Sequence, residues 1–269
     1  MNEYLEANLA AWEARTPWHV RSKFYDVPGF AAGRDTLSAV ELQALGDVRG
    51  KSLLHLQCHF GLDTLSWARH GAVVTGIDFS PTAIAEARKL AADLDLPATF
   101  VESELTALPT NLQGEFDFVF TSHGAIIWLP DLDAWARVIA HFLRPGGRFL
   151  VFEGHPFAYQ FDDEREDAEL RVRYRYFDTR TPQEAVESGT YADLEAPIVT
   201  KDYIWAHSMA EIVTSLCQAG LVIEALEEHP FLAWPMFHWM VPTGDGFWKM
   251  PVGAPDIPLS FSITCVKPR

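Results

Sequence analysis

The chain has 269 residues, of which 48% are apolar and 22% charged, a composition typical of one globular domain rather than of a disordered chain. Acidic residues outnumber basic ones by 37 to 21, so the net charge is −16 and the surface offers a nucleic acid no electrostatic attraction. The longest apolar runs, around Ala125–Leu129 and Phe149–Phe152, are only as long as strands, and a membrane span is not expected.

The first 49 residues are expected to form an N-terminal helical arm. Leu5, Leu9 and Trp12 share one helical stripe, which predicts an amphipathic helix over residues 2–15. The following segment, Trp18–Tyr25, mixes aromatic and basic residues without a clear period. It is interpreted either as a packed arm or as a lid over a ligand.

Residues 50–153 alternate strand patterns with helix patterns. Strands are predicted at residues 52–57, 73–77, 99–101, 116–121 and 148–153, and helices at residues 62–70, 80–94 and 131–143. Ser80 and Pro81 are typical of a helix start, because serine caps a free N–H and proline has none to satisfy. The alternation predicts an α/β fold with a parallel, doubly wound sheet.

The pattern changes after Gly154. Residues 154–207 are predicted to be a β-type insertion that covers the ligand edge of the sheet as a lid, with an exposed hairpin strand at Arg171–Phe177. Residues 208–269 are expected to complete the sheet with a helix ending near Gly220, a strand at residues 221–226 and an antiparallel edge strand at Leu259–Thr264. Residues 1–269 would then form a single domain.

The turn after the first strand indicates which ligand the sheet can hold. Asp78 ends the second strand, 17 residues after Gly61, which is close to the spacing of a ribose-binding acid. The alternative is that Asp78 only caps the turn. The loop Gln57–Leu62 has one glycine and several bulky side chains, so a pyrophosphate would be crowded. S-adenosylmethionine has no phosphate, and the loop therefore favours it over a dinucleotide.

Four segments together resemble the successive motifs of class I S-adenosylmethionine-dependent methyltransferases, in particular bacterial members that act on small molecules. They are Leu53–Gly61, Gly76–Pro81, Phe116–Ser122 and Leu143–Phe149. The resemblance implies a Rossmann-like, seven-stranded, mostly parallel sheet with strand order 3-2-1-4-5-7-6 and an antiparallel strand seven. It also implies S-adenosylmethionine as the cofactor.

The resemblance assigns cofactor contacts to individual residues. The loop would lie against the methionine part, Asp78 would take the ribose hydroxyls, and Phe79 would flank the adenine. Glu104 and Leu105 would meet the adenine amino group and ring, and Thr121 would lie beside the sulfonium. The loop residues concerned are Gln57, Cys58, His59, Phe60 and Gly61.

Three positions depart from the family pattern. His55 stands where the family usually has an acid, and Gln57 and His59 stand where it has glycines. These replacements predict a reshaped methionine pocket and leave open a non-catalytic relative that binds S-adenosylmethionine. A nicotinamide-dependent oxidoreductase is the other alternative. His55, Cys58 and His59 lack a fourth ligand at zinc spacing, so no metal site is expected.

The predicted function is methyl transfer from S-adenosylmethionine to an oxygen or nitrogen atom of a small molecule. His123, directly after strand four, is the candidate base or acceptor-orienting group, and a packed histidine is the alternative. Glu153 and His155 follow strand five and are weaker candidates for a base. Four tryptophans could line an acceptor pocket or simply pack in the core: Trp128, Trp205, Trp234 and Trp239.

The expected partners follow from charge and motif. Thr121–Gly124 differs from the Asn-Pro-Pro-Tyr-like signature of methyltransferases that act on nucleic-acid amines, so no nucleic acid is expected, and a homodimer stays open. The first six residues carry no basic region before an apolar core, so no secretory signal is expected. Three widely spaced cysteines, Cys58, Cys217 and Cys265, fit a reducing cytoplasm.

Overall fold

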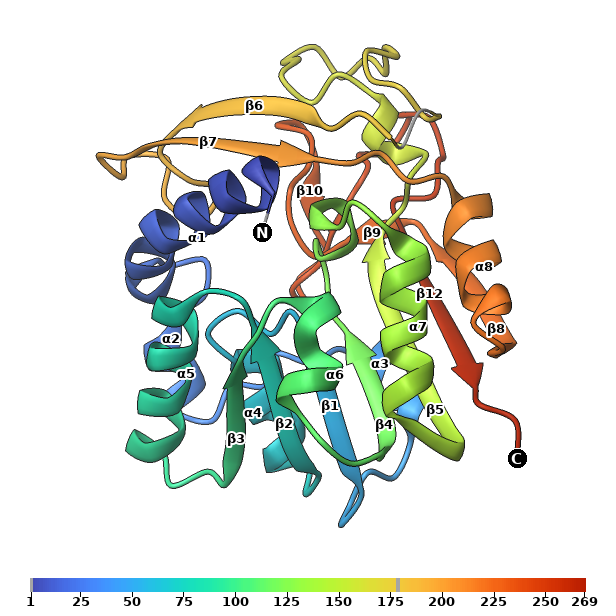
Figure 1. The fold of residues 1–269 in the computed structure, drawn as a ribbon. Coiled ribbons are helices and arrows are strands. Elements are labelled where there is room, and N and C mark those ends of the chain that lie inside the picture. Colours follow the sequence, from blue (N-terminus) through green and yellow to red (C-terminus); the bar gives the residue numbers. More distant parts are fainter. Residues whose placement is uncertain (1, 178–179) are drawn as a thin grey trace.

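The computed structural model describes residues 2–177 and 180–269. Its centre is a seven-stranded sheet with the order β3-β2-β1-β4-β5-β12-β8 (Figure 1). The strands are β1 Ser52–Leu56, β2 Val73–Asp78, β3 Ala98–Glu102, β4 Phe116–Thr121, β5 Leu143–Gly154, β8 Val222–His229 and β12 Ser260–Val266. Strands β1 to β5 pair in parallel, whereas β12 runs antiparallel to both of its neighbours. The strands β6, β7, β9, β10 and β11 lie outside this sheet. When they are left out of the numbering, β8 becomes strand six and β12 strand seven, and the order is the predicted 3-2-1-4-5-7-6.

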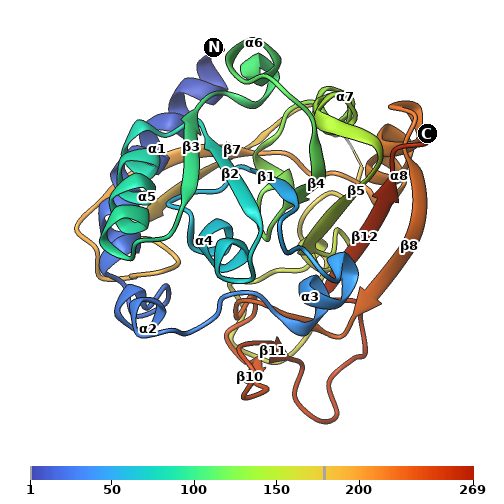
Figure 2. The ribbon, with the colours of Figure 1, turned by 90° about the horizontal axis from the view of Figure 1, so that it is seen from below.

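Helices cover both faces of the sheet (Figure 2). On one face, Leu54 and Val119 pack with Trp135 of α7 (Leu132–Phe142) and with Leu216 of α8 (Met209–Gln218). The intervening residues point to the other face because side chains alternate along a strand. There Leu53, Phe120 and Leu150 pack with Trp67 of α4 (Leu62–Arg69) and Leu45 of α3 (Ala39–Leu45). The remaining helices of this half are α5 (Pro81–Asp93) and α6 (Leu108–Asn111).

The N-terminal helix is longer than predicted. Helix α1 extends over Glu3–Arg21 and contains Pro17, and α2 (Val27–Ala31) follows it. A proline inside a helix removes one backbone bond and therefore opposes its continuation. The helix continues because Arg15 and His19, on both sides of the proline, are buried against a later part of the chain. Tertiary contacts outweigh the local signal here.

A hairpin formed by β6 (Gln183–Ser188) and β7 (Val199–Ile204) lies over α1 and above the carboxyl ends of the parallel strands (Figure 1). The predicted hairpin strand at Arg171–Phe177 is wrong, since this segment contributes only an isolated bridge between Phe161 and Val172. It is held by backbone hydrogen bonds to Gln160 and Asp162 and by side chains. Arg173 forms ion pairs with Asp162 and Glu164.

The last third of the chain completes the sheet and packs below the hairpin. Residues 228–258 include the short strands β9 (Phe231–Leu232), β10 (Val241–Pro242) and β11 (Trp248–Lys249). Strand β12 is antiparallel as predicted, but it lies between β5 and β8 and is not an edge strand. Two of its alternating hydroxyl residues, Ser260 and Ser262, are buried, and Ser262 hydrogen-bonds to His229 of the true edge strand β8 at 3.1 Å. Among the described residues, no helix is both long and apolar enough to cross a membrane.

Candidate active site

A cavity of about 1280 Å³ lies at the carboxyl ends of the parallel strands, beneath α1 and the β6–β7 hairpin. Its walls come from the segments that follow β1, β2, β3, β4 and β5, and from both covering elements. Pockets for one small ligand typically measure roughly 300–1,000 Å³. The cavity therefore has room for a cofactor and an acceptor side by side.

The loop after β1 keeps a left-handed backbone although two of its positions are not glycine. The φ angles are +56° at Gln57, +51° at His59 and +83° at Gly61. Such angles cost a non-glycine residue about 1–2 kcal/mol. Only Gly61 has no room for a side chain, because an added Cβ would lie 2.7 Å from the Phe100 ring. The replacements thus leave the loop's left-handed turns in place and add side chains to the cavity wall.

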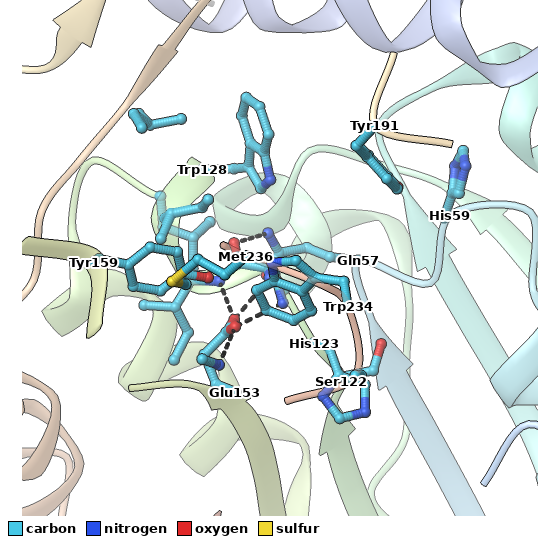
Figure 3. Close-up of a pocket in the computed structure, with 18 of the residues that line it drawn as sticks. Gln57, His59, Ser122, His123, Trp128, Glu153, Tyr159, Tyr191, Trp234 and Met236 are labelled. Carbon is cyan, nitrogen blue, oxygen red and sulfur yellow. Dashed lines mark hydrogen bonds between the residues drawn. The ribbon is translucent and has the colours of Figure 1, made fainter. Parts of the chain in front are cut away.

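These two added side chains point to different parts of the cavity (Figure 3). Gln57 donates through Nε2 to the carbonyl oxygen of Ala125, at 2.9 Å, and its Oε1 is buried without a hydrogen-bond partner. The imidazole of His59 lies 3.0 Å from that of His19 and packs against Trp12. Burial, followed by the charge of His19, lowers the pKa of His59 well below its usual value, so His59 is neutral.

Asp78 combines the two roles that the sequence left open. Its Oδ2 accepts from the backbone N–H of His59 and its Oδ1 from that of Ser80, both at 2.9 Å. It also lines the cavity. Each carboxylate oxygen has a second lone pair, so both can still accept from a ligand hydroxyl. Burial raises the pKa of Asp78 to about 6, despite these backbone bonds.

Nine of the ten predicted cofactor residues line the cavity together; Thr121 does not. Thr121 is fully buried and its hydroxyl has no hydrogen-bond partner, whereas the next residue, Ser122, lines the cavity. Phe79, Glu104 and Leu105 line the part near β2 and β3. The Glu104 carboxylate also accepts from two backbone N–H groups, and it thereby caps the short helix Leu105–Ala107.

His123 lines the cavity beside the buried carboxylate of Glu41, with 3.5 Å between Nε2 and Oε1. Burial opposes its charged form, but attraction to Glu41, Asp63 and Glu153 outweighs this and raises the pKa of His123. Its Nδ1 is buried without a hydrogen-bond partner. An imidazole with these neighbours is suited to take up a proton.

His55, which replaces the family's usual acid, has a structural role. It joins α4 to the end of β4 through Thr64, at 2.8 Å, and Ser122, at 3.0 Å. Burial, followed by the charge of His123, lowers the pKa of His55 to about 3. His55 is therefore a neutral hydrogen-bonding group. Its imidazole contacts Thr64 and Ser122, whereas the imidazole of His59 contacts His19, so the two rings do not face a common ligand.

Of the two weaker base candidates, neither is free to act on a ligand. Glu153 accepts four backbone N–H bonds, from Gly124, Ala125, Ile126 and Gly154, at 2.6–3.1 Å. These bonds use all four lone-pair positions of the carboxylate. His155 pairs with Glu228 at 2.8 Å and lies outside the cavity lining.

Side chains of α1 join the two halves of the cover, α1 and the β6–β7 hairpin, to each other. Arg15, which is 2% exposed, forms a close ion pair with Asp202 and hydrogen-bonds to Thr200 at 2.9 Å, both on β7. Asn8 makes two bonds with the backbone of Tyr203, at 2.8 and 2.7 Å. None of these partners was predicted, because they are more than 180 residues apart in the chain.

Of the four tryptophans considered, Trp128, Trp205 and Trp234 line the cavity, while Trp239 stacks on Phe237 outside it. Sequence reasoning did not single out Tyr159, which also lines the cavity. Tyr159 lies in a segment after β5 that has no periodic pattern, and nothing in its sequence context distinguishes it from a packed aromatic residue.

Comparison with known proteins relates part of the chain to a family. Residues 53–147, which contain β1 to β4 and the start of β5, match the model of a methyltransferase domain. This match and the sheet order support a class I methyltransferase domain in this part of the chain. S-adenosylmethionine is the methyl donor of this class, as the names of the structural neighbours reflect.

The similarity to curated methyltransferases is distant. An uncharacterized methyltransferase of Synechocystis sp. is 26% identical over 207 residues, which cover 75% of this chain and 92% of that protein. A ubiquinone biosynthesis O-methyltransferase of Alkalilimnicola ehrlichii is 31% identical over 121 residues, or 44% of this chain. The matched residues cover 49% of that enzyme, so the chain spans about half of its length.

Solved structures share the fold of the methyltransferase domain and most of its surroundings. A putative S-adenosylmethionine-dependent methyltransferase from Listeria monocytogenes superposes with a TM-score of 0.58 at 18% identity, covering 86% of this chain and 97% of that one. The glycopeptide N-methyltransferase MtfA, complexed with sinefungin, gives a TM-score of 0.57 at 19% identity, with 88% and 89% covered.

Proposed function

We propose that this chain transfers a methyl group from S-adenosylmethionine to an oxygen or nitrogen atom of a small molecule. The observation that carries the proposal is the position of Asp78, whose carboxylate faces the cavity next to the loop Gln57–Gly61. Both Asp78 oxygens keep one acceptor position for a ribose hydroxyl. The donor would supply an electrophilic methyl group on its sulfonium.

The other residues are assigned roles by their place around the cavity. The loop Gln57–Gly61 would hold the methionine part, while Phe79, Glu104 and Leu105 would enclose the adenine. His123 would take the proton that a hydroxyl acceptor loses when its oxygen forms the bond to carbon. Its raised pKa, caused chiefly by Glu41, favours that uptake.

The enclosure of the cavity supports a small acceptor. Residues of α1 and of the β6–β7 hairpin line it from above, so residues 1–49 and 154–207 would act together as the cover. The net charge of −16 disfavours a nucleic acid. The cysteines Cys58, Cys217 and Cys265 are unpaired, which fits the proposed cytoplasmic location.

Calorimetry with S-adenosylhomocysteine tests the assignment. Replacing Asp78 with alanine should weaken binding by about 1–3 kcal/mol, the scale of a lost hydrogen bond to a charged group. Because Asp78 also holds two backbone N–H groups, circular dichroism must show that the variant is folded. The matched control is Asp131→Ala, because Asp131 also accepts a backbone N–H, from Ala134, but does not line this cavity; its affinity should equal that of the wild type. Unchanged affinity of a folded Asp78→Ala variant would contradict the ribose assignment.

A second measurement separates an enzyme from a binding protein. Incubation with methyl-labelled S-adenosylmethionine and a panel of small alcohols, phenols and amines should yield a labelled product. Binding of the cofactor without any labelled product would favour a non-catalytic relative.

A further inference from the structure

One part of the cavity is lined by four large apolar side chains from three separate segments. Trp128 follows β4, Tyr159 follows β5, and Trp234 and Met236 belong to the segment between β9 and β10. We call these four residues the aromatic subsite. Figure 3 shows them grouped around the side chain of Gln57, with His59 and Tyr191 set apart on the other side of it. The subsite therefore lies on the other side of Gln57 from His59, although Trp128 and His59 both pack against Trp12.

Two polar atoms in this part of the cavity are buried and have no hydrogen-bond partner: the hydroxyl oxygen of Tyr159 and Oε1 of Gln57. The orientation of the Gln57 amide is fixed, because the carbonyl of Ala125 can only accept and so takes the Nε2 group. Buried polar atoms are almost always hydrogen-bonded in native proteins. Two unpaired ones in a cavity wall point to a ligand that pairs with them.

The Tyr159 hydroxyl is a donor rather than a base. Burial, and then the negative charge of Glu153, raise the pKa of Tyr159 well above its usual value, so the hydroxyl keeps its proton. Glu153 already accepts four backbone N–H bonds and has no lone pair free for this proton. The proton is thus available to a ligand.

The fold makes room for this hydroxyl at one particular residue. A Cβ added at Gly154, the last residue of β5, would lie 2.6 Å from the Tyr159 hydroxyl oxygen. The absence of a side chain at Gly154 allows the Tyr159 ring to lie against the end of the strand. A substitution there would displace the hydroxyl without removing it.

We propose that the aromatic subsite binds the methyl acceptor, and that the acceptor is a neutral, flat, largely apolar molecule with a hydroxyl group. This proposal rests on the proposed function. The aromatic walls contact its apolar body, the Tyr159 hydroxyl donates to its oxygen, and Oε1 of Gln57 accepts a hydrogen bond from its hydroxyl group. A protonated amine would also be attracted by tryptophan faces. It has no lone pair for the Tyr159 hydroxyl, however, and the neighbouring Glu153 carboxylate is saturated, so the neutral compound fits better.

Calorimetry in the presence of saturating S-adenosylhomocysteine tests the proposal with three probes of similar shape: para-cresol, toluene and para-methylbenzylamine. The wild-type protein should bind para-cresol at millimolar concentration or better, and more tightly than the other two. Tyr159→Phe should weaken para-cresol about tenfold, the scale of one hydrogen bond, and leave toluene unchanged. Gly154→Ala should weaken para-cresol in the same way.

Tyr174→Phe is the matched control, because the Tyr174 hydroxyl also belongs to the cavity lining but already bonds to Asp163 at 3.0 Å. It should bind para-cresol as the wild type does. Failure of S-adenosylhomocysteine to bind the wild type would contradict the proposed function itself. If S-adenosylhomocysteine binds normally, three results overturn the inference alone: no binding of para-cresol, tighter binding of the amine, or equal para-cresol affinity in Tyr159→Phe.

Discussion

The floor and the cover of the cavity are built in different ways. In the floor, which is formed by the ends of β1, β2, β4 and β5, buried carboxylates hold backbone N–H groups: Asp78 accepts two and Glu153 accepts four. The cover, formed by α1 and the β6–β7 hairpin, is joined by the side chains of Asn8, Arg15 and His19. The floor thus depends on backbone geometry, whereas the cover depends on a few replaceable side chains.

This difference indicates that the floor and the cover have separate roles. A floor held by backbone bonds stays fixed and can orient a cofactor, which is the precision that methyl transfer requires. The cover also bonds to the floor, because Glu13 of α1 accepts from Ser80 and Thr82, and His19 lies 3.0 Å from His59.

Removing the Arg15 guanidinium should have the largest effect. Arg15→Met leaves the carboxylate of Asp202, which is 2% exposed, buried without its partner. Breaking a buried pair in this way costs about 3–5 kcal/mol. Hydrogen exchange should show faster exchange of the β7 amides, with the protection of β1 and β4 preserved.

The control for Arg15 is Glu187→Gln, since Glu187 is the half-exposed partner of the same guanidinium. An exposed ion pair contributes about 0–1 kcal/mol, so exchange of β7 should change little. Equal loss of protection in β1 and β7 of Arg15→Met would show that floor and cover unfold together, which contradicts the contrast.

Lowering the pH should weaken cofactor binding, because Asp78 in the floor of the cavity becomes protonated. Burial raises the pKa of Asp78 to about 6, so the carboxylate becomes protonated as the pH falls through that value. A ligand that needs the charged form then binds more weakly, by up to about tenfold per pH unit below 6, and its affinity is constant above. Titrations with S-adenosylhomocysteine between pH 5 and 8 measure this, and Asp78→Asn should flatten the curve. An equally steep curve in Asp78→Asn would assign the effect to another group.

The smallest change, in the free energy of unfolding, is expected for Gln57→Gly. Gln57→Gly relieves a left-handed backbone angle, which stabilises the fold by about 1–2 kcal/mol, but it loses the bond to Ala125, which contributes about 0.5–1.5 kcal/mol. The net change in urea unfolding should therefore stay within about 1 kcal/mol. Asp95→Gly, at an exposed position with φ +52°, isolates the backbone gain. A loss above about 2 kcal/mol would make Gln57 part of the floor's framework.

The elements of the floor could be predicted from the sequence one by one, whereas for the cover only a helical N-terminal arm and a β-type insertion were predicted, without the contacts between them. Strand ends, the Ser80-Pro81 helix start and the spacing of Asp78 from Gly61 are local signals, and the structure confirms the elements they predicted. The course of α1 through Pro17 depends on contacts with a hairpin far along the chain, and local patterns carry no information about these.

The failures within the site have similar causes. Arg171–Phe177 alternates as a strand does, but within the described part of the chain its backbone pairs only with residues 160–162, through three hydrogen bonds and an isolated bridge. Thr121 ends β4 as predicted, yet the alternation of side chains turns it away from the cavity. Tyr159 depends on its contact with Gly154, which only the folded chain creates.

A crystal structure of the chain with S-adenosylhomocysteine would show directly whether Asp78 binds the ribose. We expect the ribose hydroxyls to lie within hydrogen-bonding distance of the Asp78 carboxylate, with the amino-acid tail along the loop Gln57–Gly61. A crevice still filled by the side chains of Gln57 and His59, with the nucleoside absent or bound elsewhere, would contradict it.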